Sequence, residues 1–205
     1  MKINAVISKP SIYVNYANKT AILSAVIIAM GIISGTIIFL VSDDTVAETL
    51  FEYFISFTTD FTNKNKPEIL SGLILSHIPY FVVMEILGVS VVGIYLIPMI
   101  TFIKSVGIGM LVTYIYQMFT LKGIEYCLLV LFPGKFILIF AMILLAQNCL
   151  ITSDNIRLSA HGNKDRVVEL NKYILRTIFI AMIIIVSSII DFITIISFSS
   201  LFDFT

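Results

Sequence analysis

Two lysines and two acidic residues lie inside long apolar stretches, and their side chains are the ones most able to form ion pairs or transfer protons there. Lys104 and Lys135 are the bases, and Glu85 and Asp191 are the acids. A charged group at the depth of a bilayer is costly unless it is paired or wetted, so such residues often mark functional sites. The four residues predict internal ion pairs, a packed helix interface or a hydrophilic path.

Depth along the expected helices predicts two pairs, Glu85 with Lys104 and Lys135 with Asp191. Three roles are compatible with them. The pairs fix helix register, they line a conduction or proton path, or they dock a membrane helix of a partner. His77, near mid-depth, is either a hydrogen-bonded packing residue or a group that titrates near neutral pH.

No arrangement typical of catalysis stands out. The sequence has no H-E-x-x-H, no phosphate-binding Gly-rich loop with Lys-Ser/Thr and no G-x-S-x-G. Asp191 is the only aspartate in an expected span, and His77 and His161 fall at different depths, which disfavours a shared metal site. Cys127 and Cys149 are interpreted as small apolar fillers. The prediction is a protein without enzymatic activity, metal or cofactor.

Composition places these residues in a membrane protein. The 205-residue chain is 59% hydrophobic and only 13% charged, whereas soluble domains are roughly a quarter charged. The net charge is zero, so no basic face for nucleic acid is visible. The expected environment is the lipid bilayer.

Five apolar runs are each long enough to cross a bilayer, which takes about 20 residues. They predict an all-α, polytopic protein with spans at about 20–41, 69–87, 96–118, 126–151 and 173–198. Residues 1–19 are too polar for the core of a signal peptide and form a predicted cytoplasmic tail, so the first run is interpreted as an uncleaved signal anchor. Residues 20–205 then form a single transmembrane domain.

Small residues and proline indicate where helices turn, break or approach closely. Residues 88–95 form either a very tight turn or a segment that dips into the membrane, and P-G-K at 133–135 predicts a kink or break. Gly31 and Gly35 have the G-x-x-x-G spacing of close helix contact, which serves dimerisation or is ordinary span composition. The predicted break and packing residues are Gly88, Gly93, Gly109, Pro133 and Gly134.

Residues 45–61 predict a further helix that does not span. Thr45 and Glu48 fit a capping box, and the residues that follow place a line of apolar side chains on one helical face. Glu48, Glu52 and Asp60 interrupt the apolar run. We therefore expect an amphipathic helix in the membrane interface, or one packed on the other helices.

The distribution of Lys and Arg predicts the orientation, because cytoplasmic loops carry an excess of both. A cytoplasmic N-terminus leaves three on the outer side, Lys64, Lys66 and Lys122. It places eight inside: Lys2, Lys9, Lys19, Arg157, Lys164, Arg166, Lys172 and Arg176. The prediction is a plasma-membrane protein with its N-terminus inside, its C-terminus outside and the amphipathic helix outside.

Two short motifs lie at and just after the expected turn between the second and third spans. They are I-L-G-V-S-V-V-G at 86–93 and F-I-K at 102–104 with Gly109 after it. They are similar to the L-L-G-x-S-x-x-G and F-L-K-G-x-x-x-G elements of the stage II sporulation protein M family. His77 stands where family members often have a histidine.

The resemblance continues towards the C-terminus and covers nearly the whole chain. F-P-G at 132–134 falls where the family has a proline-centred break, and Asp191 resembles the acidic position of its last span. Ser105 departs from the usual glycine, and Gly134 and Lys135 depart from the usual polar residues.

The resemblance implies an integral membrane protein of a Gram-positive cell. Sporulating members act in forespore engulfment, where they anchor a membrane complex with cell-wall-degrading partners and perform no known chemistry themselves. Some relatives look like membrane subunits of ATP-driven exporters.

Two functions therefore remain open. One is a non-catalytic scaffold that positions wall hydrolases through its outer surface. The other is the membrane subunit of an ABC-type exporter, a homodimer with a cytosolic ATPase. The exporter needs a coupling element, for which residues 152–172 are the only loop of sufficient length. Its partner-facing residues are Arg157, Asp165, Arg166 and Glu169.

Overall fold

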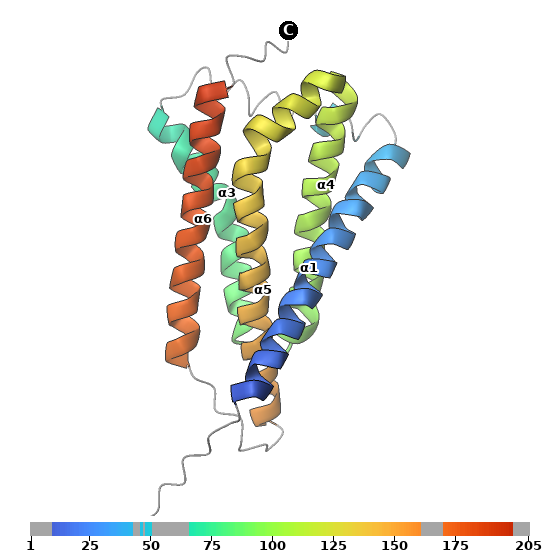
Figure 1. The fold of residues 1–205 in the computed structure, drawn as a ribbon. Coiled ribbons are helices and arrows are strands. Elements are labelled where there is room, and N and C mark those ends of the chain that lie inside the picture. Colours follow the sequence, from blue (N-terminus) through green and yellow to red (C-terminus); the bar gives the residue numbers. More distant parts are fainter. Residues whose placement is uncertain (1–9, 43–45, 47, 51–65, 161–169, 199–205) are drawn as a thin grey trace, which may run out of the picture.

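The computed structural model describes residues 10–42, 46, 48–50, 66–160 and 170–198. This part of the chain is built from long helices (Figure 1). They are α1 (Pro10–Val41), α3 (Lys66–Gly88), α4 (Gly93–Tyr126), the π-helical η1 (Cys127–Leu131), α5 (Phe132–Ala160) and α6 (Leu170–Phe198).

Five helical segments are long and apolar enough to cross a membrane, which agrees with the predicted all-α, five-span class. They are Ala17–Val41, Lys66–Gly88, Gly93–Gln117, Thr120–Ala160 and Leu170–Phe198. Most of the predicted amphipathic helix, residues 51–61, lies outside the described residues, and so do Thr45, the C-terminal residues 199–205 and the tail residues 1–9.

Helix α5 lies in the middle of the bundle and packs on α1, α3, α4 and α6 (Figure 1). Helix α1 packs mainly on α4, and α6 packs on α5 and α3. Large apolar side chains cover the outside, for example Leu175 with 71% and Phe179 with 64% of its surface exposed. Water would oppose such exposure, whereas hydrocarbon favours it.

Two expected loops are helical. The predicted third and fourth spans leave a connection between residues 118 and 126, but helix continues through residues 122–125 and the chain turns at Thr120, whose φ of 51° is unusual for a β-branched residue. Residues 152–160 were predicted to begin a polar loop, but they form the last turns of α5. Polar residues continue a helix readily when its backbone hydrogen bonds are already in place.

Pro133 distorts its helix without breaking it. The π-helical turn Cys127–Leu131 precedes it, and the Phe132 N–H donates to Cys127 O, five residues back. Proline cannot donate to the carbonyl four residues earlier, and its ring clashes there. The wider π-turn accommodates both effects, so the predicted break is a local widening within Thr120–Ala160.

The segment between α3 and α4 is a tight turn. Helix α3 ends at Gly88 and α4 begins at Gly93, three residues earlier than the predicted span. The N–H of Ser90 donates to Leu87 O at 3.0 Å, and Gly93 N–H donates to Ser90 O at 3.2 Å. A side chain on Gly93 would collide with the backbone of Leu87. Of the two predicted alternatives, the structure therefore has the tight turn.

The G-x-x-x-G residues of α1 pack within the chain. A Cβ on Gly31 would lie 2.6 Å from Ser105 Cβ, and one on Gly35 would collide with the backbone of Val106. On the facing helix, a Cβ on Gly109 would collide with the backbone of Ile32. Three glycines thus bring α1 and α4 into close contact, as small residues do in membrane helix pairs.

Candidate functional site

A polar layer crosses the bundle between two apolar cores. The first core includes Phe39, Ile69, Leu73, Tyr114, Ile115, Tyr126, Val130 and Ile195. The second includes Met84, Ile97, Ala141, Leu145, Ala146, Cys149, Leu150, Ile180 and Ile184. On each of α3, α4, α5 and α6, a polar or charged residue lies between the two: His77, Lys104, Lys135 and Asp191.

Lys135 and Asp191 form an ion pair within this layer. Lys135 Nζ lies 3.0 Å from Asp191 Oδ2, and the two side chains retain 26% and 4% of their exposure. This is the pairing that depth along the helices predicts. The buried carboxylate lies directly against Gly134, where a Cβ would overlap it. Gly134 thus leaves room for the Asp191 carboxylate to pack against the α5 backbone. The sequence predicted a helix break at Gly134 and not this contact.

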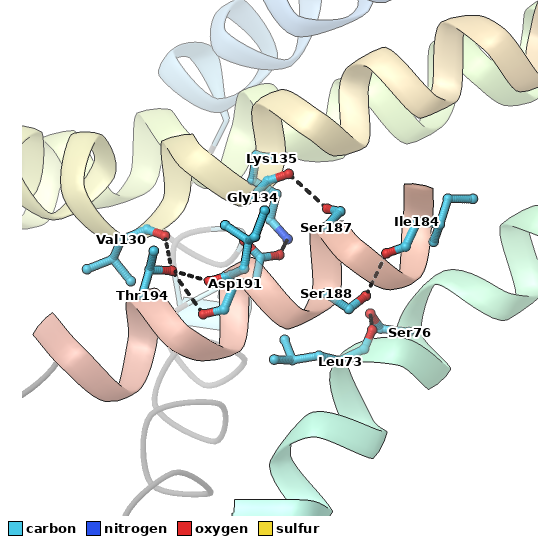
Figure 2. Close-up of polar contacts among 11 residues, drawn as sticks. Leu73, Ser76, Val130, Gly134, Lys135, Ile184, Ser187, Ser188, Asp191 and Thr194 are labelled. Atoms are coloured by element: carbon cyan, nitrogen blue, oxygen red, sulfur yellow. Dashed lines mark hydrogen bonds and ion pairs between the residues drawn. The ribbon is translucent and has the colours of Figure 1, made fainter. Parts of the chain in front are cut away.

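Hydroxyl groups tie α6 to α5 on both sides of this pair (Figure 2). Ser187 Oγ donates to Gly134 O at 2.8 Å. Thr194 Oγ1 donates to Val130 O, a carbonyl of the π-helical turn, at 3.0 Å. The ion pair and the Ser187 hydrogen bond join α6 to α5, and the Thr194 hydrogen bond joins α6 to η1, so together they fix the register of α6 on the continuous η1–α5 segment.

His77 and Lys104 complete the layer from α3 and α4. His77 is 94% buried (6% exposed), and its Nε2 has no hydrogen-bond partner among the described residues. Lys104 is half-buried and stands level with His77, because each lies eleven residues from the α3–α4 turn. Residues Ile100 and Ile108, one turn before and after Lys104, pack against the interior clusters, so Lys104 lies on an inward-facing side of α4.

Glu85 is held by a different set of groups near the Gly88 end of the bundle. The Tyr173 hydroxyl donates to Glu85 Oε2 at 2.5 Å, and Thr177 Oγ1 lies 3.2 Å from both carboxylate oxygens. Asn148 Nδ2 in turn lies 3.3 Å from Thr177 Oγ1. A carboxylate that accepts short hydrogen bonds from hydroxyl groups is strongly stabilised without a cation.

The predicted pair of Glu85 with Lys104 is wrong. Across the described residues, no ion pair joins the two side chains. Glu85 stands three residues before the end of α3, about 4.5 Å along the helix, whereas Lys104 stands eleven residues after the start of α4, about 16 Å. They therefore differ in depth by about 12 Å, too far for contact. His77, eleven residues before Gly88, is the residue level with Lys104.

Of the proposed partner-facing residues, only Arg157 is described. It lies on the last turns of α5, and its Nη2 is 2.8 Å from Asp154 Oδ1. Asp165, Arg166 and Glu169 lie outside the described residues. At the same end of the bundle, Ser153 Oγ donates to Ser90 O at 2.7 Å and ties α5 to the α3–α4 turn.

The arrangement positions helices and holds buried charges. Within the residues that the structure describes, no group of three or more His, Cys, Asp or Glu side chains could hold a metal ion. Cys127 and Cys149 are free thiols, and Cys149 Sγ lies 3.8 Å from the Tyr173 hydroxyl inside the second core. The layer supplies lysines from two helices, Lys104 of α4 and Lys135 of α5, against the single carboxylate of Asp191.

Sequence comparison gives these features a context. The chain matches the family model described as Stage II sporulation protein M over residues 24–195. The chain belongs to this family. The matched region contains all four residues of the polar layer, as well as Glu85 and the glycines of the α1–α4 contact. Comparisons with curated proteins and with solved structures found no match.

Membership of the stage II sporulation protein M family accords with the resemblance seen in the motifs at 86–93 and 102–104. It describes a polytopic membrane protein, and it gives no support to the exporter alternative. Pairing buried acids with buried bases in the sequence did not identify Tyr173 and Thr177 as the partners of Glu85. It also did not identify Ser187 as a donor to the backbone of α5. A signal was present, because these three residues recur at helical spacing along one face of α6.

Proposed function

We propose that this protein is a non-catalytic component of a larger membrane complex, a scaffold for engulfment that anchors peptidoglycan-remodelling partners. The observation that carries the proposal is the family match over residues 24–195. Members that resemble this chain in sporulating cells act in that process. The substrate of the complex is peptidoglycan, which this chain itself does not process.

The described geometry is consistent with a scaffold. The charged and hydroxyl groups of the spans connect helix to helix: Lys135 binds Asp191, Tyr173 binds Glu85, and Ser187 binds the backbone of α5. Glycines join α1 closely to α4. Such contacts favour one fixed arrangement of helices, which suits a protein whose role is to hold others in place.

The orientation belongs to the same proposal. The Lys and Arg distribution favours a plasma-membrane protein with residues 43–65 and the C-terminus outside and residues 161–169 inside. Reporter fusions test this directly. Alkaline phosphatase fused within residues 43–65 should be active, and the same fusion within 161–169 should be inactive. The reverse pattern would contradict the outward placement of the surface that a scaffold needs.

Affinity purification tests the function. The full chain with an N-terminal tag is purified in mild detergent from sporulating cells, and the co-purifying proteins are identified by mass. We expect extracytoplasmic wall hydrolases in constant ratio to the chain. A matched variant with residues 45–61 replaced by a Gly/Ser linker of equal length should lose them while its membrane level is unchanged. Stoichiometric recovery of an ATP-binding subunit, without hydrolases, would instead favour an exporter.

A further inference from the structure

The polar layer carries an excess of positive charge. Asp191 is its one carboxylate, and Lys135 already pairs with it. Lys104 lies at the same depth, and in the described part of the chain no hydrogen bond or ion pair engages its Nζ. An unpaired ammonium group at mid-bilayer depth is costly, so an acidic partner is expected.

His77 gives a second and independent indication. Its Nε2 is buried and has no hydrogen-bond partner among the described residues. Buried polar atoms without a partner are rare in native structures and call for an unseen group. His77 of α3 and Lys104 of α4 stand at the same distance from the α3–α4 turn, so the orphaned nitrogen and the unpaired ammonium lie at one level of the bundle.

Depth restricts where the missing acid comes from. His77 and Lys104 each stand eleven residues from the α3–α4 turn, about 16 Å along their helices. The hydrocarbon core is about 30 Å thick, so both residues lie near its middle. Lipid phosphates stay in the headgroup region, and soluble anions would have to cross hydrocarbon. A group carried on another transmembrane helix reaches this depth from the side.

The acidic residues in the described spans of a second copy of the chain do not fit the charge requirement. Among the acidic residues of the described spans, Asp191 alone lies in the layer, and Lys135 engages it. Glu85 lies about 12 Å nearer the α3–α4 turn by helical rise, and Tyr173 and Thr177 hold it. The occupant is therefore a different protein.

We propose that Lys104, at the level of His77, is a docking site for a carboxylate carried at mid-depth by a transmembrane helix of a partner protein. The proposal rests on the proposed role in a membrane complex and adds the chemistry by which one partner is recognised. Lys104 supplies the ion pair, and its half-buried position leaves part of the side chain accessible. His77 Nε2 gains its hydrogen bond when the carboxylate or the reoriented Lys104 approaches it.

A designed helix tests the site without knowledge of the partner. The full chain, labelled at its N-terminus, is reconstituted in phosphatidylcholine vesicles with a synthetic Leu/Ala transmembrane helix that has one central Glu, or Gln as control. Energy transfer reports association. We expect the Glu helix to bind about three- to tenfold more tightly than the Gln helix, the range that polar contacts between membrane helices give.

Matched variants assign the effect to Lys104. Lys104→Met should abolish the preference for Glu, whereas Lys122→Met, at an exposed site near the helix ends, should retain it. Lys104→Glu should prefer a helix with a central Lys. Equal binding of the Glu and Gln helices, or a preference that survives Lys104→Met, overturns the proposal. Loss of the preference in sodium acetate but not in sodium chloride assigns the site to free carboxylates and also overturns it.

The two proposals fail separately. If wall hydrolases co-purify with the chain but Lys104 does not distinguish Glu from Gln, the scaffold stands and the docking site is wrong. If Lys104 selects the Glu helix but no hydrolase is recovered, the site stands and its partner belongs to another complex.

Discussion

Asp191 lies against Gly134 so closely that a methyl group at position 134 would overlap its carboxylate. The glycine next to Lys135 therefore lets the acid of α6 reach the base of α5, whose Nζ it meets at 3.0 Å. Small residues allow backbones to approach in membranes. Here the approach also brings two opposite charges together in the interior.

The Gly134→Ala substitution should lower the free energy of unfolding by about 1–3 kcal/mol, because the added methyl overpacks the contact and displaces Asp191. Reversible unfolding in mixed micelles of mild detergent and sodium dodecyl sulfate measures the change. Gly107→Ala is the matched control, since a Cβ at Gly107 meets nothing within 4 Å. An equal loss of stability in both variants would contradict the packing explanation.

Removing one partner of the Lys135–Asp191 pair should cost more than removing both, because a lone buried charge remains. Lys135→Met should cost about 3–5 kcal/mol of unfolding free energy, since it strands a carboxylate that is 4% exposed. Asp191→Asn should cost less, because Lys135 retains 26% exposure and can reorient. The double variant, Lys135→Met with Asp191→Asn, should lose less unfolding free energy than Lys135→Met alone.

The same micelle unfolding experiment on the wild type, both single variants and the double variant measures this coupling. If the cost of the double variant equals the sum of the two singles, the groups are independent and the pair does not stabilise the register of α6 on α5.

The success with Lys135–Asp191 and the failure with Glu85–Lys104 have one physical explanation. Charge matching works where the stabilising partner is itself charged, and Asp191 has such a partner. Glu85 is held by the neutral hydroxyls of Tyr173 and Thr177, which charge matching does not detect. The misplaced start of the third span, at 96 instead of Gly93, added to the error in depth.

Span number and type followed from apolar runs, because bilayer thickness sets a minimum length that few other structures need. The ends of the helices could not be predicted as well from the apolar runs. Helix α5 continues to Ala160 through polar residues, and the turn at Thr120 uses a backbone conformation that its sequence does not announce. The last turns of α5 are held by a distant segment, through the hydrogen bond from Ser153 to Ser90 O, and a linear pattern does not contain such a contact.

Tyr173→Phe should lower the free energy of unfolding by about 1.5–3 kcal/mol, because it removes a short hydrogen bond to a charged group. In the Glu85→Gln background the same change should cost less, since the remaining acceptor is neutral. Thermal unfolding in detergent, followed by circular dichroism, gives the four values. Tyr116→Phe removes the same atom from an exposed ring and should have little effect. Identical costs of Tyr173→Phe in both backgrounds would exclude the carboxylate as its partner.

Two glycines of α4, Gly107 and Gly109, differ in what they face, and only Gly109 takes part in the close contact with α1. A Cβ at Gly109 would collide with the backbone of Ile32, whereas a Cβ at Gly107 meets nothing within 4 Å. Gly109→Leu should therefore separate α1 from α4 and lower the free energy of unfolding by at least about 1–3 kcal/mol. Gly107→Leu should be tolerated, because its side chain points away from the contact.

The association state distinguishes this packing from dimerisation. Because Gly31 and Gly35 are occupied by α4 of the same chain, Gly35→Leu should destabilise the monomer fold and leave the fraction of cross-linked dimer in vesicles unchanged relative to Gly107→Leu. A selective loss of dimer in Gly35→Leu, with unfolding unaltered, would mean that these glycines face another copy of the chain.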